Sequence, residues 1–272
     1  MKKLILLILA LFLMTGCIDY SSKVHVKPDG SGTIEENVLI SRVVIDMMSS
    51  FAQSFDDSSE TVTGFELFDE EELISQAIKM GEGVSYVWGE KIQAGGKEGY
   101  KAVFTFKDIS KLKLSETPED KLPAGGLSDE VDPAEEEYIT FNFTKGNPAM
   151  LEIELPRDSM EIGNDEPVDV NEEDSSQVGE AWAEQAKMFL KGLRIEMSVD
   201  FEGDIQETNA TYREQNQITL FEMNFDQLLE SPEKFDELKK VQPQSMEEIK
   251  ELMKDIPGFK FELNNKVFVK FN

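Results

Sequence analysis

Short segments in which apolar and polar residues alternate recur along the chain, and they limit its fold more than any other feature. A period of two places one side of a strand against a core and the other side toward solvent. The clearest segment, 193–202, alternates Leu193, Ile195, Met197, Val199 and Phe201 with polar residues. Similar segments are 23–26, 33–40, 84–92, 100–106, 138–143, 150–155, 217–223, 259–263 and 267–271. The sequence therefore predicts a fold built on half-buried β-strands.

Turn residues between consecutive segments predict how the strands pair. Glycine and asparagine accept the positive φ that tight hairpin turns require. Such residues separate four pairs of segments, at 28–32, 94–96, 145–148 and 264–265. Each pair is expected to form an antiparallel hairpin, including a C-terminal hairpin of 259–263 with 267–271.

Helical spacing of apolar residues predicts helices over 41–55, with Ser41 as N-cap, and over 69–80, 176–191, 226–240 and 245–254. These helices interrupt the strands without a regular βαβ rhythm. The predicted fold class is α+β, with an antiparallel β-sheet built from hairpins and helices packed on one face.

The N-terminus has the features of an export signal. Lys2 and Lys3 precede an uninterrupted apolar run at 4–14, which is too short for a membrane span of about 20 residues but fits the apolar core of a signal peptide. The run ends in Leu13-Met14-Thr15-Gly16-Cys17, which resembles the lipobox of bacterial lipoproteins, with Met14 where leucine is usual. The resemblance implies cleavage after Gly16 and fatty acyl chains, such as palmitate, on Cys17.

Cysteine usage supports the same interpretation. Cys17 is the only cysteine in the chain, so it has no internal disulfide partner. In enteric-type sorting an aspartate directly after the lipidated cysteine retains a lipoprotein in the inner membrane. Ile18 occupies that position, which predicts the outer membrane if the host has one.

The expected organisation follows from these segments. Residues 1–16 are a lipoprotein signal peptide, 17–22 a lipidated tether, and 23–272 an α+β globular region. That region could divide into subdomains 23–156 and 175–272, joined by an acidic loop. Residues 115–137 and 157–174 are rich in acids and poor in large apolar side chains, and both are expected to be surface loops. Within the second, 165–174 is a candidate for weak cation binding, although a solvated loop is the favoured interpretation.

The charge of the chain limits its partners. The whole chain carries a net charge of −28. Cleavage after Gly16 removes Lys2 and Lys3 and no acid, which leaves 25 basic and 55 acidic side chains and a net charge of −30. Nucleic acids and anionic lipid head groups would be repelled.

No catalytic, metal or cofactor motif is recognisable. His25, the only histidine, lies in a predicted strand between Val24 and Val26, so a solvent-facing side chain is favoured over a general base or metal ligand. The chain has no G-x-S-x-G, P-loop or G-x-G-x-x-G motif. We therefore expect no enzymatic activity, no cofactor and no metal.

Two segments resemble known lipoproteins. Residues 24–33, around Asp29-Gly30-Ser31-Gly32, resemble the start of a loose group of uncharacterised bacterial lipoproteins. Residues 201–210 and 217–220 resemble LppM-type lipoprotein domains, with Glu202 where proline would be usual. The resemblance implies an envelope lipoprotein and transfers no catalytic residue.

The sequence thus favours a membrane-anchored, non-enzymatic envelope lipoprotein that binds a partner or supports envelope assembly. One alternative is a carrier or sensor of an apolar ligand, with a groove lined by Met47, Met48, Phe51 and Phe55. A carboxylate-based hydrolase is a further, less favoured alternative.

Overall fold

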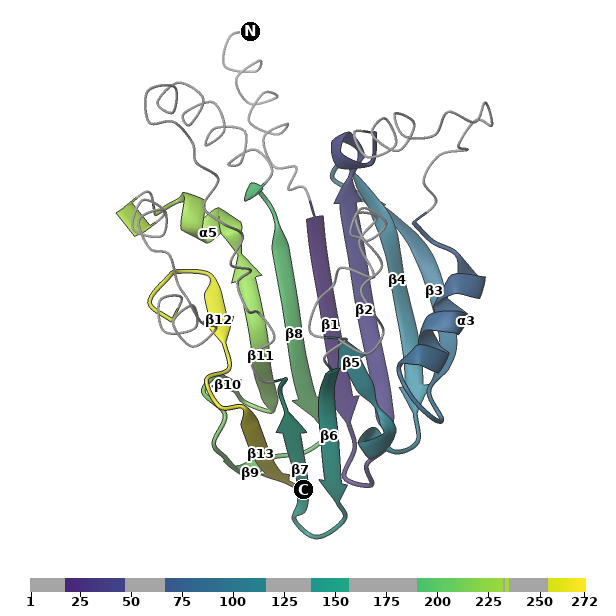
Figure 1. The fold of residues 1–272 in the computed structure, drawn as a ribbon, viewed down its shortest axis with the longest axis vertical. Coiled ribbons are helices and arrows are strands. Elements are labelled where there is room, and N and C mark those ends of the chain that lie inside the picture. Colours follow the sequence, from purple (N-terminus) through teal and green to yellow (C-terminus); the bar gives the residue numbers. More distant parts are fainter. Residues whose placement is uncertain (1–17, 47–66, 116–137, 157–189, 232, 235–253) are drawn as a thin grey trace, which may run out of the picture.

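The computed structural model describes residues 18–46, 67–115, 138–156, 190–231, 233–234 and 254–272. Two β-sheets dominate this part of the chain (Figure 1). The larger sheet has eight strands in the order β10-β11-β8-β1-β2-β4-β3, with β12 also paired to β11. Its strands are β1 (Ile18–Val26), β2 (Gly32–Ser41), β3 (Ser85–Ala94), β4 (Lys97–Phe106), β8 (Arg194–Phe201), β10 (Arg213–Glu214), β11 (Gln217–Asn224) and β12 (Phe259–Phe261).

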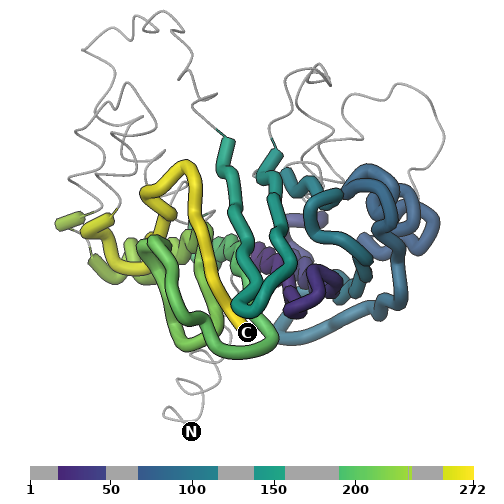
Figure 2. Tube along the Cα trace, turned by 90° about the horizontal axis from the view of Figure 1, so that it is seen from below, coloured from purple at the N-terminus to yellow at the C-terminus, as the bar shows by residue number. Residues whose placement is uncertain are grey.

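The smaller sheet has five strands in the order β5-β6-β7-β13-β9. These are β5 (Lys113–Ser115), β6 (Tyr138–Thr144), β7 (Ala149–Glu154), β9 (Ile205–Thr208) and β13 (Lys266–Phe271). Figure 2 shows this sheet standing out from one side of the larger sheet. The named helical elements among the described residues are α3 (Glu70–Lys79), the 3₁₀ turn η1 (Ile109–Lys111) and α5 (Phe225–Leu229), and residues 42–46 are also helical.

Three of the four predicted hairpins are confirmed. β1 pairs with β2, β3 with β4, and β6 with β7, all antiparallel. In the first turn, Lys27 N donates to Ser31 O at 2.9 Å and Gly30 N donates to Lys27 O at 2.9 Å. Gly30 has φ +86, the positive value that its sequence position predicts. Local turn chemistry is therefore sufficient to set these three pairings.

The predicted C-terminal hairpin is wrong. Both of its strands exist, but β12 pairs with β11 in the larger sheet while β13 lies between β7 and β9 in the smaller one. Residues 262–265 carry the chain from one sheet to the other. Glu262 N donates to Leu220 O at 2.8 Å, and Leu155 N donates to Asn265 O at 2.9 Å. Hydrogen bonds to two separate sheets thus replace the expected two-residue turn.

The sheets are not purely antiparallel, because β1 pairs in parallel with β8 over eight residue pairs from Asp19–Arg194 to Val26–Phe201. This pairing changes two further expectations. Residues 18–22 form the first half of β1 and are not a tether. Each sheet also combines strands from 18–156 with strands from 194–271, so the described residues do not divide into the two expected subdomains.

One apolar core joins the two sheets. Phe201 of β8 packs edge-to-face against Phe271 of β13, with ring centroids 4.7 Å apart, and both side chains are buried. Helix α3 lies on the same side of the larger sheet, since Gln76 Nε2 donates to Glu36 Oε2 of β2 at 2.9 Å. In the described residues, the layer predicted to consist of helices is therefore formed mainly by a second sheet, with α3 beside it.

Helix α3 forms as predicted. Asp69 caps its start by accepting hydrogen bonds from Glu71 N at 2.8 Å and Glu72 N at 3.4 Å. Leu73 and Ala77 are the buried residues of this helix. Ser41 Oγ accepts from Val44 N at 3.4 Å, as expected of an N-cap. The rest of the predicted helix 41–55, most of 176–191, residues 232 and 235–240 of 226–240, nearly all of 245–254, and the acidic stretches 116–137 and 157–174 lie outside the described residues. The described start of 226–240 is helical as α5, over Phe225–Leu229.

Candidate functional site

The face of the larger sheet that points away from the smaller sheet, here called the outer face, is polar. In β1 the residues Tyr20, Ser22, Val24 and Val26 are buried against the core, so the residues between them project to the other side. The registers of β1 with β2 and β8 place polar residues of all three strands together on this face. They include Ser21, Lys23, His25, Glu35, Asn37, Glu196 and Asp200.

His25 lies on the outer face, and its partner is an acid from the neighbouring parallel strand. His25 Nδ1 is 3.0 Å from Asp200 Oδ2, and each side chain is 39 % exposed. A second acid near His25 is Glu35 of β2, and the hydrogen bond from Lys101, whose Nζ is 2.7 Å from Glu35 Oε1, is the largest cause of its lowered pKa. Nearby His25 makes a small further contribution to that shift. Both acids near His25 thus have a basic partner.

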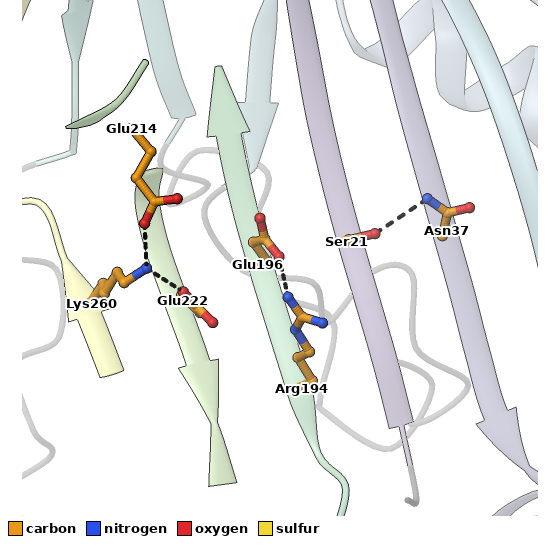
Figure 3. A network of polar contacts seen from close by, with 7 residues as sticks. All are labelled: Ser21, Asn37, Arg194, Glu196, Glu214, Glu222 and Lys260. Atoms are coloured by element: carbon orange, nitrogen blue, oxygen red, sulfur yellow. Dashed lines mark hydrogen bonds and ion pairs between the residues drawn. The ribbon is translucent and has the colours of Figure 1, made fainter. Parts of the chain in front are cut away.

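Further charges on this face form pairs between Arg194 and Glu196 and around Lys260 (Figure 3). Arg194 Nη2 lies 2.7 Å from Glu196 Oε2. Lys260 Nζ lies 3.0 Å from Glu222 Oε2 and 3.6 Å from Glu214 Oε1, and the hydrogen bond with Glu222 raises the pKa of Lys260. Such half-exposed pairs each stabilise a protein by less than about 1 kcal/mol. The basic side chains therefore offset part of the acidic charge on this face.

The Glu35–Lys101 pair gives a pH-dependent prediction. Because the pKa of Glu35 is lowered on folding, its contribution to stability is present above the unfolded-state pKa and is lost as the pH falls through the folded-state pKa. Lys101→Met is therefore expected to destabilise the protein by less than about 1 kcal/mol near pH 7, after solvent screening is allowed for. Urea unfolding should show the difference shrinking as the pH is lowered.

Exposed Lys107, the residue directly after β4, provides the matched control. Lys107→Met removes the same charge without removing the partner of Glu35. A stability difference between the Lys101→Met and Lys107→Met proteins that does not change with pH would contradict the proposed role of Glu35.

Two buried acids are not indicated by the sequence analysis. Glu36 is fully buried on the core side of β2, opposite Ser22 of β1. Glu262 is 1 % exposed, and its carboxylate accepts hydrogen bonds from Thr211 and Asn264. The alternation of Ile34, Glu36 and Val38 is a signal that could have located the first acid, since it puts Glu36 at a core position.

Large apolar side chains are exposed where α3 packs along β3. Ile74 and Ile78 lie one turn apart on α3 and are both exposed, Ile78 to 74 %. Val87 and Trp88 are exposed on β3, which is an end strand of the larger sheet. The strand register shifts between Tyr86 and Trp88, so Val87 is the extra residue of a bulge. Trp88 pairs with Val103, between the core-facing Ala102 and Phe104, so it projects to the outer face, whereas α3 lies on the core side. We therefore give the name α3–β3 patch to Ile74 and Ile78 alone, the exposed apolar residues of α3 beside β3. Exposed apolar groups at a sheet edge are typical of protein interaction surfaces.

Several predicted site residues lie outside the described part of the chain. Cys17 is one of them, and β1 begins at the next residue. The candidate cation loop 165–174 and the residues of the candidate apolar groove, Met47, Met48, Phe51 and Phe55, are outside as well. Within the described residues, no cluster of three or more histidine, cysteine or acidic side chains is arranged to hold a metal ion. No helix in those residues has the length and apolar character needed to cross a membrane.

Comparison with known proteins gives little beyond a weak structural likeness. No protein-family profile matches the chain, and no curated protein matches it. Among solved structures, the chain is similar to the NMR structure of the folded domain of LppM from Mycobacterium tuberculosis. The likeness covers 94 % of this chain and 91 % of the LppM chain, with 8 % sequence identity and a TM-score of 0.33.

Proposed function

We propose that this protein is a lipid-anchored bacterial envelope protein, without enzymatic activity, that binds a protein partner. The position of β1 carries the proposal. Because β1 begins at Ile18, cleavage after Gly16 would leave every described strand and helix intact. The signal-like segment 1–16 thus precedes β1 in the sequence, and Cys17 would become the first residue of the mature chain.

Substitution of the predicted lipid attachment site tests the anchor. Two or three acyl chains hold a protein on a membrane because each buried CH₂ contributes about 0.8 kcal/mol. Cys17→Ser is expected to abolish labelling by a fatty-acid probe and to move the protein out of the membrane fraction. Ser21→Ala, a small substitution nearby in β1, serves as the control and should leave both unchanged. Equal labelling of the Cys17→Ser and parent proteins would refute the anchor.

The residue after the cysteine leads to a proposal about location. Ile18 is not an aspartate, so in a host with two membranes the protein is expected to fractionate with the outer membrane. Ile18→Asp should shift it toward the inner-membrane fraction. Density-gradient fractionation of both proteins measures this, and parent protein in the inner-membrane fraction would contradict the proposed location.

The α3–β3 patch is the surface that we propose for the partner. A photoactivatable amino acid at Ile78 should give a discrete crosslinked species in intact cells. The same amino acid at Lys145, which is exposed in the turn between β6 and β7, is the control. Equal crosslinking at the two positions, or none at Ile78, would argue against this surface.

A further inference from the structure

We propose that the lipid on Cys17 holds the domain end-on, so that the end of the eight-stranded sheet at which β1 begins is the end nearer the bilayer. This inference rests on the proposed lipid anchor and adds the orientation of the domain and the residues that face the membrane. The surface is defined by the elements that lie beside the start of β1, and the ligand is the surface of a lipid bilayer.

The link between Cys17 and the fold has almost no slack. Ile18 is already paired with Ile40 of β2, and Asp19 is paired with Arg194 of β8. β1 is thus held on both sides from its second residue onward. Consecutive Cα atoms are about 3.8 Å apart, whereas a strand as long as β1 extends for about 30 Å. A lipid on Cys17 must therefore lie close to this end of the sheet.

Several other elements end at the same place, which we call the anchor end. Ser41 at the end of β2 pairs with Lys97 at the start of β4. Arg42 N donates to Gly96 O at 3.2 Å, and Phe225 N donates to Leu193 O at 3.1 Å. Figure 1 shows β1 starting at the top of the view, beside the end of β2 and near the start of β8. The helical residues 42–46 and α5 lie at this end as well.

The opposite end carries the β1–β2 and β6–β7 turns. Val26 at the end of β1 pairs with Gly32 of β2 and with Phe201 of β8. Gly30, in the turn between β1 and β2, lies against the ring of Phe143 in β6. The β6–β7 turn at 145–148 is therefore at this end, and it is lowest in Figure 1. The length of β1 separates Lys145 from the anchor end.

The anchor end can contact a bilayer, but its side chains provide no strong electrostatic attraction to lipid. Val43 is apolar and 76 % exposed, so it can contact the interface without unfolding. The nearby arginines are balanced by acids, because Arg42 Nε lies 3.5 Å from Glu98 Oε1 and Arg194 Nη2 lies 2.7 Å from Glu196 Oε2. In so acidic a chain, no net electrostatic attraction to anionic lipids is expected. The orientation must therefore come from the short covalent link.

The test places a fluorophore at each end of the lipidated protein. Acylated Cys17 is the only native cysteine, so Val43→Cys and Lys145→Cys each provide a unique thiol for an environment-sensitive dye. Both proteins are reconstituted into phosphatidylcholine vesicles that contain nitroxide-labelled lipid. Quenching at position 43 is expected to be several-fold stronger than at 145. Equal quenching in acylated protein would overturn the inference.

A linker variant tests the cause of the orientation. Insertion of about 20 Gly/Ser residues between Cys17 and Ile18 gives a flexible reach of about 25 Å and should remove the difference between the two positions. Persistent strong quenching at 43 would show that the surface itself binds lipid, and it would contradict the covalent explanation.

Mass spectrometry of the N-terminal peptide distinguishes a failure of the proposed lipid anchor from a failure of the proposed orientation. An unacylated Cys17 refutes the proposed anchor, whereas acylated protein without position-dependent quenching refutes only the orientation.

Discussion

Phe271→Ala is expected to lower the free energy of unfolding by about 3–5 kcal/mol, the usual cost of truncating a phenylalanine in a packed core. Phe271 is fully buried at the end of β13. Its ring packs against Phe201 of the larger sheet and lies 6.5 Å from the ring of Phe143 in the same sheet. Truncation would therefore leave a cavity between the two sheets and weaken their contact.

The same strand supplies a matched control. Phe268 lies three residues earlier in β13, on its other face, and is only partly buried. Phe268→Ala removes the same atoms without opening the core between the sheets, so we expect a clearly smaller loss. Chemical unfolding of both variants measures the difference. Equal destabilisation, or two separate unfolding transitions in the parent, would contradict a core shared by both sheets.

Local sequence signals predict the local parts of this fold. Short turns with glycine or asparagine join β1 to β2, β3 to β4 and β6 to β7, so each pairing is decided within a few residues. Helix α3 follows in the same way from Asp69 and the spacing of Leu73 and Ala77. These elements depend on neighbours in the chain, and single-sequence reasoning is sensitive to such neighbours.

Long-range pairing is different, because alternation shows that a strand has a buried side but not which strand lies beside it. His25 and Asp200 are 175 positions apart, and nothing in either segment indicates that β1 and β8 pair in parallel. The same ambiguity explains the incorrect C-terminal hairpin. The turn at 264–265 is compatible with a hairpin, but β11 and β7 provide alternative partners for the two strands.

The candidate sites also differ in whether local sequence is enough to find them. Cys17 is identified from a contiguous motif, and the solvent-facing position of His25 follows from strand alternation. The α3–β3 patch requires knowledge that β3 is an end strand and that α3 leaves Ile78 uncovered. The role of Glu262 is equally hidden, because Thr211 is about 50 residues away in the sequence.

Glu262 gives the second large effect, because it stabilises the point at which the chain crosses between the two sheets. Its Oε1 accepts from Thr211 Oγ1 at 2.7 Å and from Asn264 N and Nδ2 at 2.9 Å each, and its Oε2 accepts from Thr211 N at 2.7 Å. Glu262→Leu would remove the acceptor of four donors. Since a buried unpaired donor costs about 1–3 kcal/mol, we expect a loss of several kcal/mol.

The isosteric Glu262→Gln variant distinguishes hydrogen bonding from shape. Glutamine keeps one oxygen, but its amide nitrogen would face donors, so we expect an intermediate loss of about 1–3 kcal/mol. Glu214→Gln is the control. Glu214 is largely exposed, and its one ion-pair contact here, from Oε1 to Lys260 Nζ, is long at 3.6 Å. Its effect should be below about 1 kcal/mol. If urea unfolding gave the order parent, Glu214→Gln, Glu262→Gln, Glu262→Leu from most to least stable, the carboxylate would be established as the acceptor that fixes the crossing. A Glu262→Gln protein as stable as the parent would show instead that side-chain shape at position 262 is sufficient to separate β12 from β13.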